Sequence, residues 1–289
     1  MFKKLLKYDM KAIWNVWWIL AVSVLGASAV AAFLLRFVIS NYESIEFIGA
    51  TMTFATAIAM LMLVLLFLGI YSSIFVTLVL VYFRFYKNFY TDEGYLTFTL
   101  PTSRKLLLLS KTVNALIWMA LHVALYAVSI FLICLFAPPA YDGGFFNFVA
   151  LQEIGSFFQH LWSAAGGWLI VYALEVLLLL VALGLFSISL IHFCITVGSI
   201  IAKKMKLLAA IGIYYLVNMI LSFVLEFVFL FGGISIVDGM MVLLADASLW
   251  VSRSAVAVVL LACCAVVATL ACTFYCMTLS RLERKLNLA

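Results

Sequence analysis

Six long apolar runs, separated by short polar segments, dominate the chain. They cover approximately residues 13–39, 47–83, 112–136, 162–201, 207–231 and 255–279. A membrane-spanning helix needs about 20 apolar residues to cross a hydrocarbon layer of roughly 30 Å, where the backbone must satisfy its own hydrogen bonds. The pattern therefore predicts an all-α integral membrane protein, with six transmembrane helices in a single transmembrane domain over residues 1–289.

The second and fourth runs are longer than one perpendicular crossing requires, because a helix rises about 1.5 Å per residue. Each of these two runs must tilt, break or project into water. For the second run we expect projection into water at its cytoplasmic end.

Composition agrees with membrane insertion and argues against several enzyme classes. Hydrophobic residues make up 68% of the 289 residues, whereas soluble domains are roughly half apolar, so one aqueous core cannot enclose this much hydrocarbon. The sequence contains neither the G-x-x-x-x-G-K-[ST] phosphate loop nor the H-E-x-x-H metal motif. We therefore expect a chain that is not an enzyme and that has no catalytic, cofactor or metal site of its own.

Basic residues are distributed asymmetrically between the polar segments. Fifteen of the 17 Lys and Arg lie in the N-terminal segment, between the second and third runs, in A-K-K-M-K, and in the C-terminal tail. The alternate loops contain no Lys or Arg and carry Glu43, Glu46, Asp142, Glu153, Asp238 and Asp246. By the positive-inside rule, the chain is predicted to be a multi-pass plasma-membrane protein with both termini cytoplasmic. Anionic lipid accounts for the net charge of +5 without any nucleic acid.

The polar segment between the second and third runs reads Y-T-D-E-G-Y-L-T-F-T-L-P-T-S-R-K-L-L-L-L-S-K, from Tyr90 to Lys111. A helix that leaves the membrane near Tyr90 should turn sharply near Gly94. Y-L-T-F-T-L then forms a short amphipathic segment, and Thr102 or Ser103 can cap a new helix. The residues alone predict a compact corner inside the cell, and a solvated loop with a positive-inside bias remains the alternative.

This segment resembles the connection between the second and third helices of ABC exporter permeases of the type-2 class. The likeness consists of the acidic pair, the Gly-Tyr, the Leu and Thr stretch, and the L-P-T-S-R with its later S-K. The N-terminal K-K-L-L-K-Y-D-M-K-A-I-W is similar to the interfacial elbow helix of small permeases of this group from Firmicutes-type bacteria. In that family the connection is a coupling helix that docks into a cleft of the partner ATPase.

The resemblance implies a function and a set of partners. The chain would be the permease subunit of an ATP-driven exporter of amphipathic or hydrophobic substrates, such as peptides, lipids or drugs. It would pair with a second permease chain, as a homodimer or heterodimer, and with two ATP-binding subunits that hold ATP and Mg. The coupling segment would be residues 90–111, and its ATPase contacts would be Asp92, Glu93, Gly94, Tyr95, Leu96, Pro101, Ser103 and Arg104.

Polar residues inside the runs are the candidates for a substrate path. At 3.6 residues per turn, four of them in the fifth run fall within an arc of about 80°. The full set of candidates is Glu175, His192, Tyr215, Asn218, Ser222 and Glu226. These residues either form hydrogen bonds between helices or line a path for the substrate. A stand-alone secondary transporter that uses Glu175 and Glu226 is the alternative function, because intramembrane carboxylates often belong to ion pathways.

Overall fold

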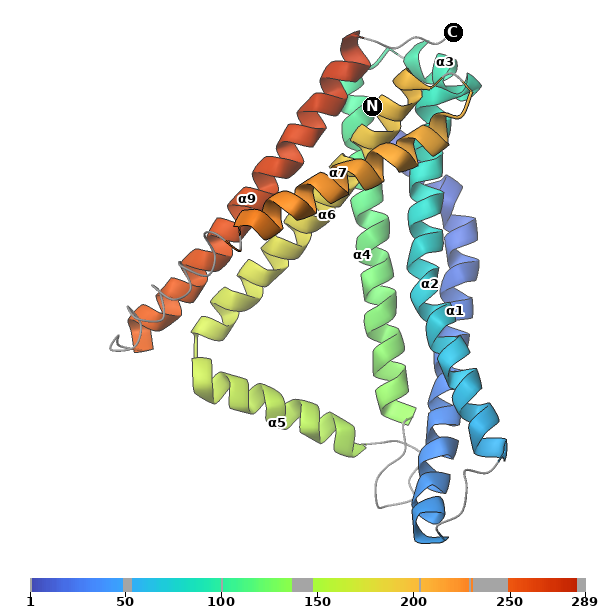
Figure 1. The fold of residues 1–289 in the computed structure, drawn as a ribbon, viewed down its shortest axis with the longest axis vertical. Coiled ribbons are helices and arrows are strands. Elements are labelled where there is room, and N and C mark those ends of the chain that lie inside the picture. Colours follow the sequence, from blue (N-terminus) through green and yellow to red (C-terminus); the bar gives the residue numbers. More distant parts are fainter. Residues whose placement is uncertain are drawn as a thin grey trace. The chain divides into compact units, whose positions relative to one another are not determined.

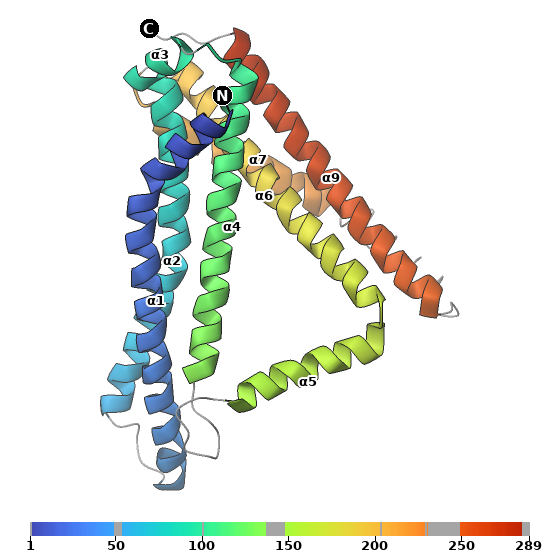
Figure 2. The ribbon, with the colours of Figure 1, turned by 180° about the vertical axis from the view of Figure 1, so that it is seen from behind.

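The computed structural model describes residues 2–48, 54–99, 101–136, 148–202, 204–228, 230 and 249–284. All regular structure within these residues is helical (Figures 1 and 2). The helices are α1 (Phe2–Ile48), α2 (Phe54–Tyr90), α3 (Asp92–Thr99), α4 (Arg104–Phe136), α5 (Phe148–Ala165), α6 (Trp168–Ile201), α7 (Lys206–Val228) and α9 (Leu249–Arg284). The all-α prediction is thus confirmed for the described part of the chain.

Among the described residues, six helices are long and apolar enough to cross a membrane, as the sequence pattern predicts. The stretches that meet these criteria are Phe2–Ser40, Thr56–Tyr90, Arg104–Phe136, Trp168–Ile201, Lys206–Phe227 and Val251–Glu283. Within each stretch, an 18-residue window has a mean hydropathy between 2.1 and 2.8. Six such helices fit a multi-pass membrane protein.

Two of the differences between the helices and the predicted runs change the number or extent of the elements. α1 is one continuous helix of 47 residues, so the expected N-terminal elbow segment and the first run belong to the same helix. The fourth run is broken: α5 ends at Ala165 and α6 begins at Trp168. Gly166 between them has a φ of 57°, a left-handed conformation that glycine adopts without a steric penalty.

Parts of four expected segments lie outside the described residues. They are residues 49–53 of the second run, Leu100 of the coupling segment, Phe229 and Phe231 of the fifth run, and the loop acids Asp142, Asp238 and Asp246.

The helices divide into two compact units, which are described separately. The first unit contains residues 1–2, 82–116 and 167–289, and the second contains residues 3–81 and 117–166. The division falls within α2 and within α4.

In the second unit, aromatic and small side chains hold α1, α2 and α4 together. Trp118 of α4 is fully buried, and its ring centroid lies 5.2 Å from that of Trp17 in α1. Farther along α1, Ala31 and Val38 are buried in one cluster with Ala59 and Leu63 of α2. Alanine at positions 31 and 59 allows close helix approach, which is how helices pack when no water drives their association.

His122 is the buried polar centre of the second unit. Its Nε2 lies 3.1 Å from Ser73 Oγ, and its Nδ1 lies 3.0 Å from Thr77 Oγ1. Both hydroxyls belong to α2, whereas His122 belongs to α4. Both ring nitrogens therefore have partners, which indicates a structural role for this histidine.

In the first unit, α6 packs along α9 and α7. Phe274 of α9 lies between two α6 rings, with centroids 6.0 Å from Phe186 and 5.4 Å from Phe193. On α7 the contact is much closer, because a Cβ placed on Gly198 of α6 would lie 2.5 Å from the backbone nitrogen of Ala210. Only glycine fits this crossing point of α6 and α7.

The close approach at Gly198 generates a stability prediction. We expect G198A to lower the thermal midpoint of the detergent-solubilised chain, because forced overpacking costs typically about 1–3 kcal/mol. G212A is the matched control: it lies in α7, and a Cβ there meets nothing within 4 Å. Because alanine favours helix over glycine by up to about 1 kcal/mol, G212A should leave the midpoint unchanged or raise it. Equal midpoints for G198A and the unaltered chain would contradict the tight crossing.

Candidate functional site

The candidate site is the corner formed by the end of α2, the short helix α3 and the start of α4. The chain bends at Thr91, whose carbonyl oxygen accepts a hydrogen bond of 2.8 Å from the Gly94 nitrogen. The sequence predicts a turn near Gly94, and in the structure the bend lies three residues earlier, at Thr91. Asp92 and Glu93 occupy the first turn of α3, and their negative charges favour a helix start there because they oppose the helix dipole.

Gly94 is buried inside α3 and does not belong to its outer surface. A Cβ on Gly94 would lie 2.8 Å from the backbone oxygen of Phe89. Glycine therefore allows α3 to fold back closely on the last turn of α2.

Glu93 links α3 to α2. Its Oε1 lies 2.7 Å from Lys87 Nζ, and both side chains are about half exposed. With the Asn88 amide nitrogen turned toward Glu93, it donates to Oε2 at 3.1 Å while the amide oxygen accepts from Lys111 of α4. Exposed ion pairs contribute only up to about 1 kcal/mol to stability. The main role of Glu93 is therefore to connect α3 with α2 and, through Asn88, with α4.

Arg104, the first residue of α4, faces the end of α9. Its Nη1 donates hydrogen bonds to the backbone oxygens of Leu282 and, at 2.9 Å, of Glu283. The guanidinium carbon also lies 5.8 Å from the centroid of the Phe98 ring in α3. The last carbonyls of a helix have no partner within the helix and carry partial negative charge, so Arg104 caps α9 while contacting α3.

Tyr90 joins the corner to α6 and α7. Its hydroxyl donates a hydrogen bond of 2.7 Å to Thr196 Oγ1 of α6, and its backbone oxygen accepts one of 3.4 Å from Lys206 Nζ of α7. Thr196 in turn donates to the backbone oxygen of His192. Tyr90, Arg104 and Lys206 therefore tie the corner to α6, α7 and α9.

Ser103 directly precedes α4 and caps its first turn. Its Oγ accepts a long hydrogen bond of 3.4 Å from the Leu106 nitrogen, and its backbone oxygen accepts from Leu107 at 3.2 Å. Of the two residues that the sequence offers as caps, Ser103 is the one that makes these bonds. Pro101 precedes it as an exposed bend residue.

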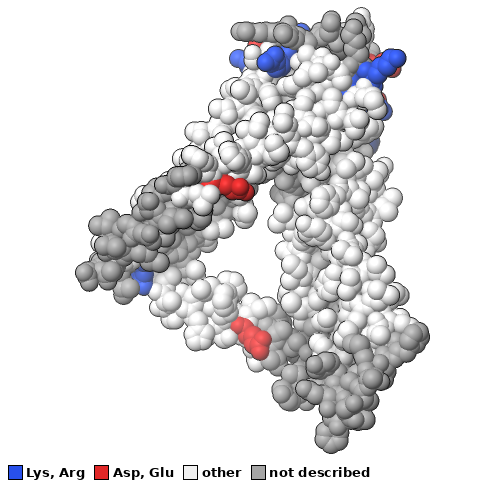
Figure 3. All heavy atoms as spheres, in the orientation of Figure 1, with Lys and Arg blue, Asp and Glu red and all other residues white. Residues whose placement is uncertain are grey.

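One face of α3 remains open. Asp92, Tyr95, Leu96 and Thr99 are spaced as i, i+3, i+4 and i+7, which places them on one side of a helix. All four are exposed, Tyr95 to 65% and Leu96 to 69%. We call these four residues the α3 face. In Figure 3, Lys and Arg atoms are visible at the end of the first unit that carries α3.

Glu175 and His192 are buried in α6. One carboxylate oxygen of Glu175 has no hydrogen-bond partner among the described residues, and its backbone oxygen lies 3.7 Å from Cys264 Sγ of α9. The His192 ring stacks on Phe85 of α2 at 3.9 Å between centroids. Neither His192 nitrogen has a hydrogen-bond partner in the described part of the chain.

The polar residues of α7 lie in a different environment. Tyr215, Ser222 and Glu226 are exposed, and Asn218 is half-buried with its Nδ2 donating to the Tyr214 backbone oxygen. The six residues singled out for a substrate path thus divide between an exposed face of α7 and buried positions in α6.

Sequence reasoning missed the contacts of Tyr90, Thr196 and Lys206. The hydrogen bond from Tyr90 to Thr196 joins residues 106 positions apart, and no local pattern marks such a pair. The described residues contain no group of three His, Cys, Asp or Glu that could hold a metal ion.

Known proteins provide no comparison for this chain: no family model, no curated protein and no solved structure matches it.

The Tyr90 to Thr196 hydrogen bond can be tested with a double-mutant cycle. We expect Y90F and T196V each to lower the free energy of unfolding in detergent, with a coupling energy of about 0.5–1.5 kcal/mol, because a buried hydrogen bond contributes about that much. Y82F is the matched control, since the buried Tyr82 hydroxyl has no hydrogen-bond partner among the described residues. Y82F should therefore be neutral or stabilising. Purely additive effects of Y90F and T196V would argue against this link.

Proposed function

We propose that this chain is the membrane-spanning permease subunit of an ATP-driven ABC transporter, and that the α3 face docks on a partner ATPase. The observation that carries the proposal is the contrast between the two sides of α3. Its inner side is fixed to the neighbouring helices, whereas its outer side exposes Tyr95 and Leu96 at the basic end of the spans. Exposed aromatic and aliphatic side chains on a rigid helix suit a docking surface, and tyrosine is enriched among residues that dominate binding energy.

The inner contacts of the corner support a coupling role. Glu93 connects α3 to α2, and Arg104 connects α3 and α4 to the end of α9. Tyr90 connects the same corner to α6 and α7. A force applied to α3 by a partner therefore reaches five helices through side chains that act as positioning residues. Coupling of this kind needs two sites that bias one assembly between two states.

In the proposed assembly, two ATP-binding subunits hold ATP and Mg, and the permease forms a homodimer or a heterodimer with a second permease chain. Closure of the ATPases on ATP moves α3. The helices then rearrange so that the central path opens in turn to each side of the plasma membrane. The polar side of α7, with the exposed Tyr215 and Ser222 and the half-buried Asn218, supplies part of that path. An amphipathic or hydrophobic export substrate, such as a peptide, lipid or drug, suits this mixture of polar and apolar side chains. Both termini lie in the cytoplasm.

One observation favours a second function, that of a stand-alone secondary transporter. Glu175 is buried in a long apolar helix, and one of its carboxylate oxygens has no hydrogen-bond partner among the described residues. A buried carboxylate with incomplete hydrogen bonding is costly, and intramembrane carboxylates mark many ion pathways. Glu226, the second acidic residue of this hypothesis, is exposed on α7.

The docking proposal predicts the loss of a partner. After mild solubilisation of native membranes, the tagged chain should bring down an ATPase that mass spectrometry identifies. The double variant Y95A/L96A should lower the recovered ATPase at least tenfold, because truncation of a few anchor residues each costs about 1–2 kcal/mol or more. F158A is the matched control, since Phe158 is an exposed aromatic residue of α5 outside the corner, and it should leave recovery unchanged.

Two results would overturn the docking proposal. In the first, the unaltered chain is recovered without any ATPase in several detergents. In the second, Y95A/L96A and the unaltered chain recover equal amounts, which would indicate that the α3 face lies in the lipid interface.

E175Q separates the two functions. If the chain is an ABC permease, E175Q should retain ATP-driven export and keep or raise the thermal midpoint, because glutamine keeps the side-chain size and places no ionisable group at this buried position. A proton-coupled carrier that uses Glu175 would lose proton-driven flux in reconstituted vesicles. E153Q, which changes an exposed carboxylate on α5, is the control for loss of one negative charge.

A further inference from the structure

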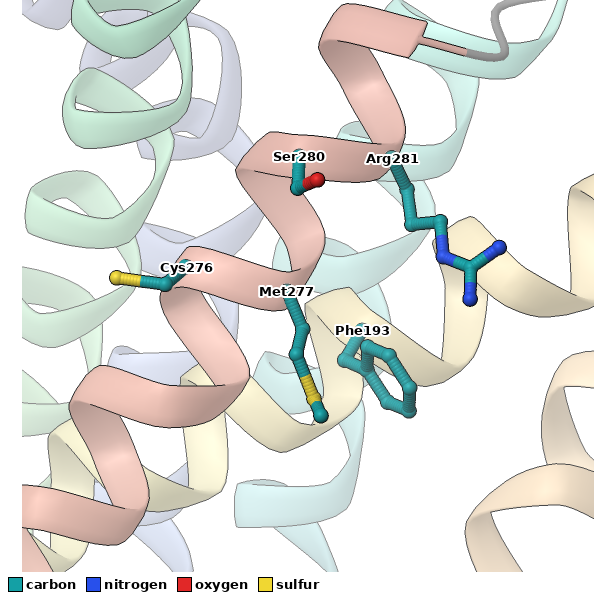
Figure 4. Close-up of a pocket in the computed structure, with 5 residues that line it drawn as sticks. All are labelled: Phe193, Cys276, Met277, Ser280 and Arg281. Carbon is teal, nitrogen blue, oxygen red and sulfur yellow. The ribbon is translucent and has the colours of Figure 1, made fainter.

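A groove of about 400 Å³ opens along the seam between α6 and α9, within the first unit. Figure 4 shows the side chains that line it: Phe193 from α6, and Cys276, Met277, Ser280 and Arg281 from α9. Its volume falls within the roughly 300–1,000 Å³ typical of small-molecule sites. None of these residues takes part in the corner described above.

One end of the groove is apolar. Met277 is 52% exposed, and in Figure 4 its thioether lies beside the Phe193 ring. The Phe193 ring packs against Phe274, and Phe274 packs against Phe186 one step farther along the seam. These aromatic contacts hold the Phe193 side of the groove, and they extend an apolar strip along two membrane-spanning helices. A hydrocarbon chain fits such a strip.

The other end of the groove is cationic. Arg281 lies in the last turn of the apolar stretch Val251–Glu283, at the basic end of the first unit. Its side chain is exposed, and it forms no hydrogen bond or ion pair within the part of the chain that the structure describes. Ser280, the preceding residue, adds a hydroxyl group to the lining of the same groove. A guanidinium with free donors matches the oxygen geometry of phosphate, which it can bind through two parallel hydrogen bonds.

We propose that this groove binds an anionic phospholipid. The Arg281 guanidinium and the Ser280 hydroxyl hold the phosphate, and an acyl chain lies over Met277 and Phe193. The charge selects an anionic lipid, because basic pockets between spanning helices at the cytoplasmic side bind anionic headgroups. The apolar strip selects a lipid over a soluble phosphate. The bound lipid bridges α6 and α9, and the proposal does not depend on the transport function.

The test uses the purified full chain in detergent with defined lipid additions, and native mass spectrometry counts the lipids that stay bound. Phosphatidylglycerol should remain bound in preference to phosphatidylcholine. R281Q should weaken phosphatidylglycerol binding about fivefold, the contribution of one arginine near an anionic headgroup. K105Q is the matched control, because Lys105 is an exposed basic residue of α4 outside the groove, and it should bind phosphatidylglycerol like the unaltered chain.

A second variant tests the apolar part without changing charge. M277W fills the groove and should also weaken phosphatidylglycerol binding, while inorganic phosphate at millimolar concentration should not displace the lipid. Three results would overturn the proposal: equal binding by R281Q and the unaltered chain, equal losses in R281Q and K105Q, or displacement of the lipid by phosphate. The second result would indicate unspecific surface charge, and the third would indicate a site for soluble anions.

Discussion

A hydrocarbon layer offers no water to hydrogen-bond, and this constraint governs where every polar group of the chain lies. Within the described helices, many Ser and Thr hydroxyls donate to a backbone oxygen three or four residues earlier, as Ser28 does to Val24. His122 finds its partners across a helix interface in Ser73 and Thr77. Charged side chains cost more free energy to remove from water, and they lie mainly at the basic helix ends. The corner and the groove between α6 and α9 are both found there.

The corner illustrates how a short helix can be fixed on one side and open on the other. Its inner contacts are weak one by one: a half-exposed ion pair at Glu93, a helix cap from Arg104 and a hydrogen bond from Tyr90. Together they connect α3 to helices from both halves of the sequence. Because α3 has only eight residues, it is too short to be stable alone, so its position depends on these neighbours. A rearrangement of the neighbouring helices in the first unit should therefore change the orientation of α3.

α6 is the central helix of the first unit, since it packs against both α7 and α9. It combines three kinds of interface along its length. Glycine at position 198 gives backbone contact with α7, and aromatic rings at 186 and 193 pack on α9. Thr196 receives the hydrogen bond of Tyr90 from the corner. Any motion that reaches α6 must change at least one of these interfaces, because packed interfaces shift between discrete arrangements and do not deform continuously.

The sequence by itself determined the helical class, the six apolar spans, the asymmetry of basic residues and the start of a helix just after Thr102 or Ser103. Each depends on residues within about one helix turn or one run, so local composition suffices. Tertiary structure decided the turn at Thr91, the burial of Gly94, the direction of Arg104 toward α9 and the crossing of Gly198 over Ala210. The long apolar runs fix which segments enter the membrane. However, apolar residues lie on almost every side of such helices, so the pattern does not show which side faces a neighbour. The neighbour of each face is therefore set by small residues and single polar contacts between segments far apart in the chain.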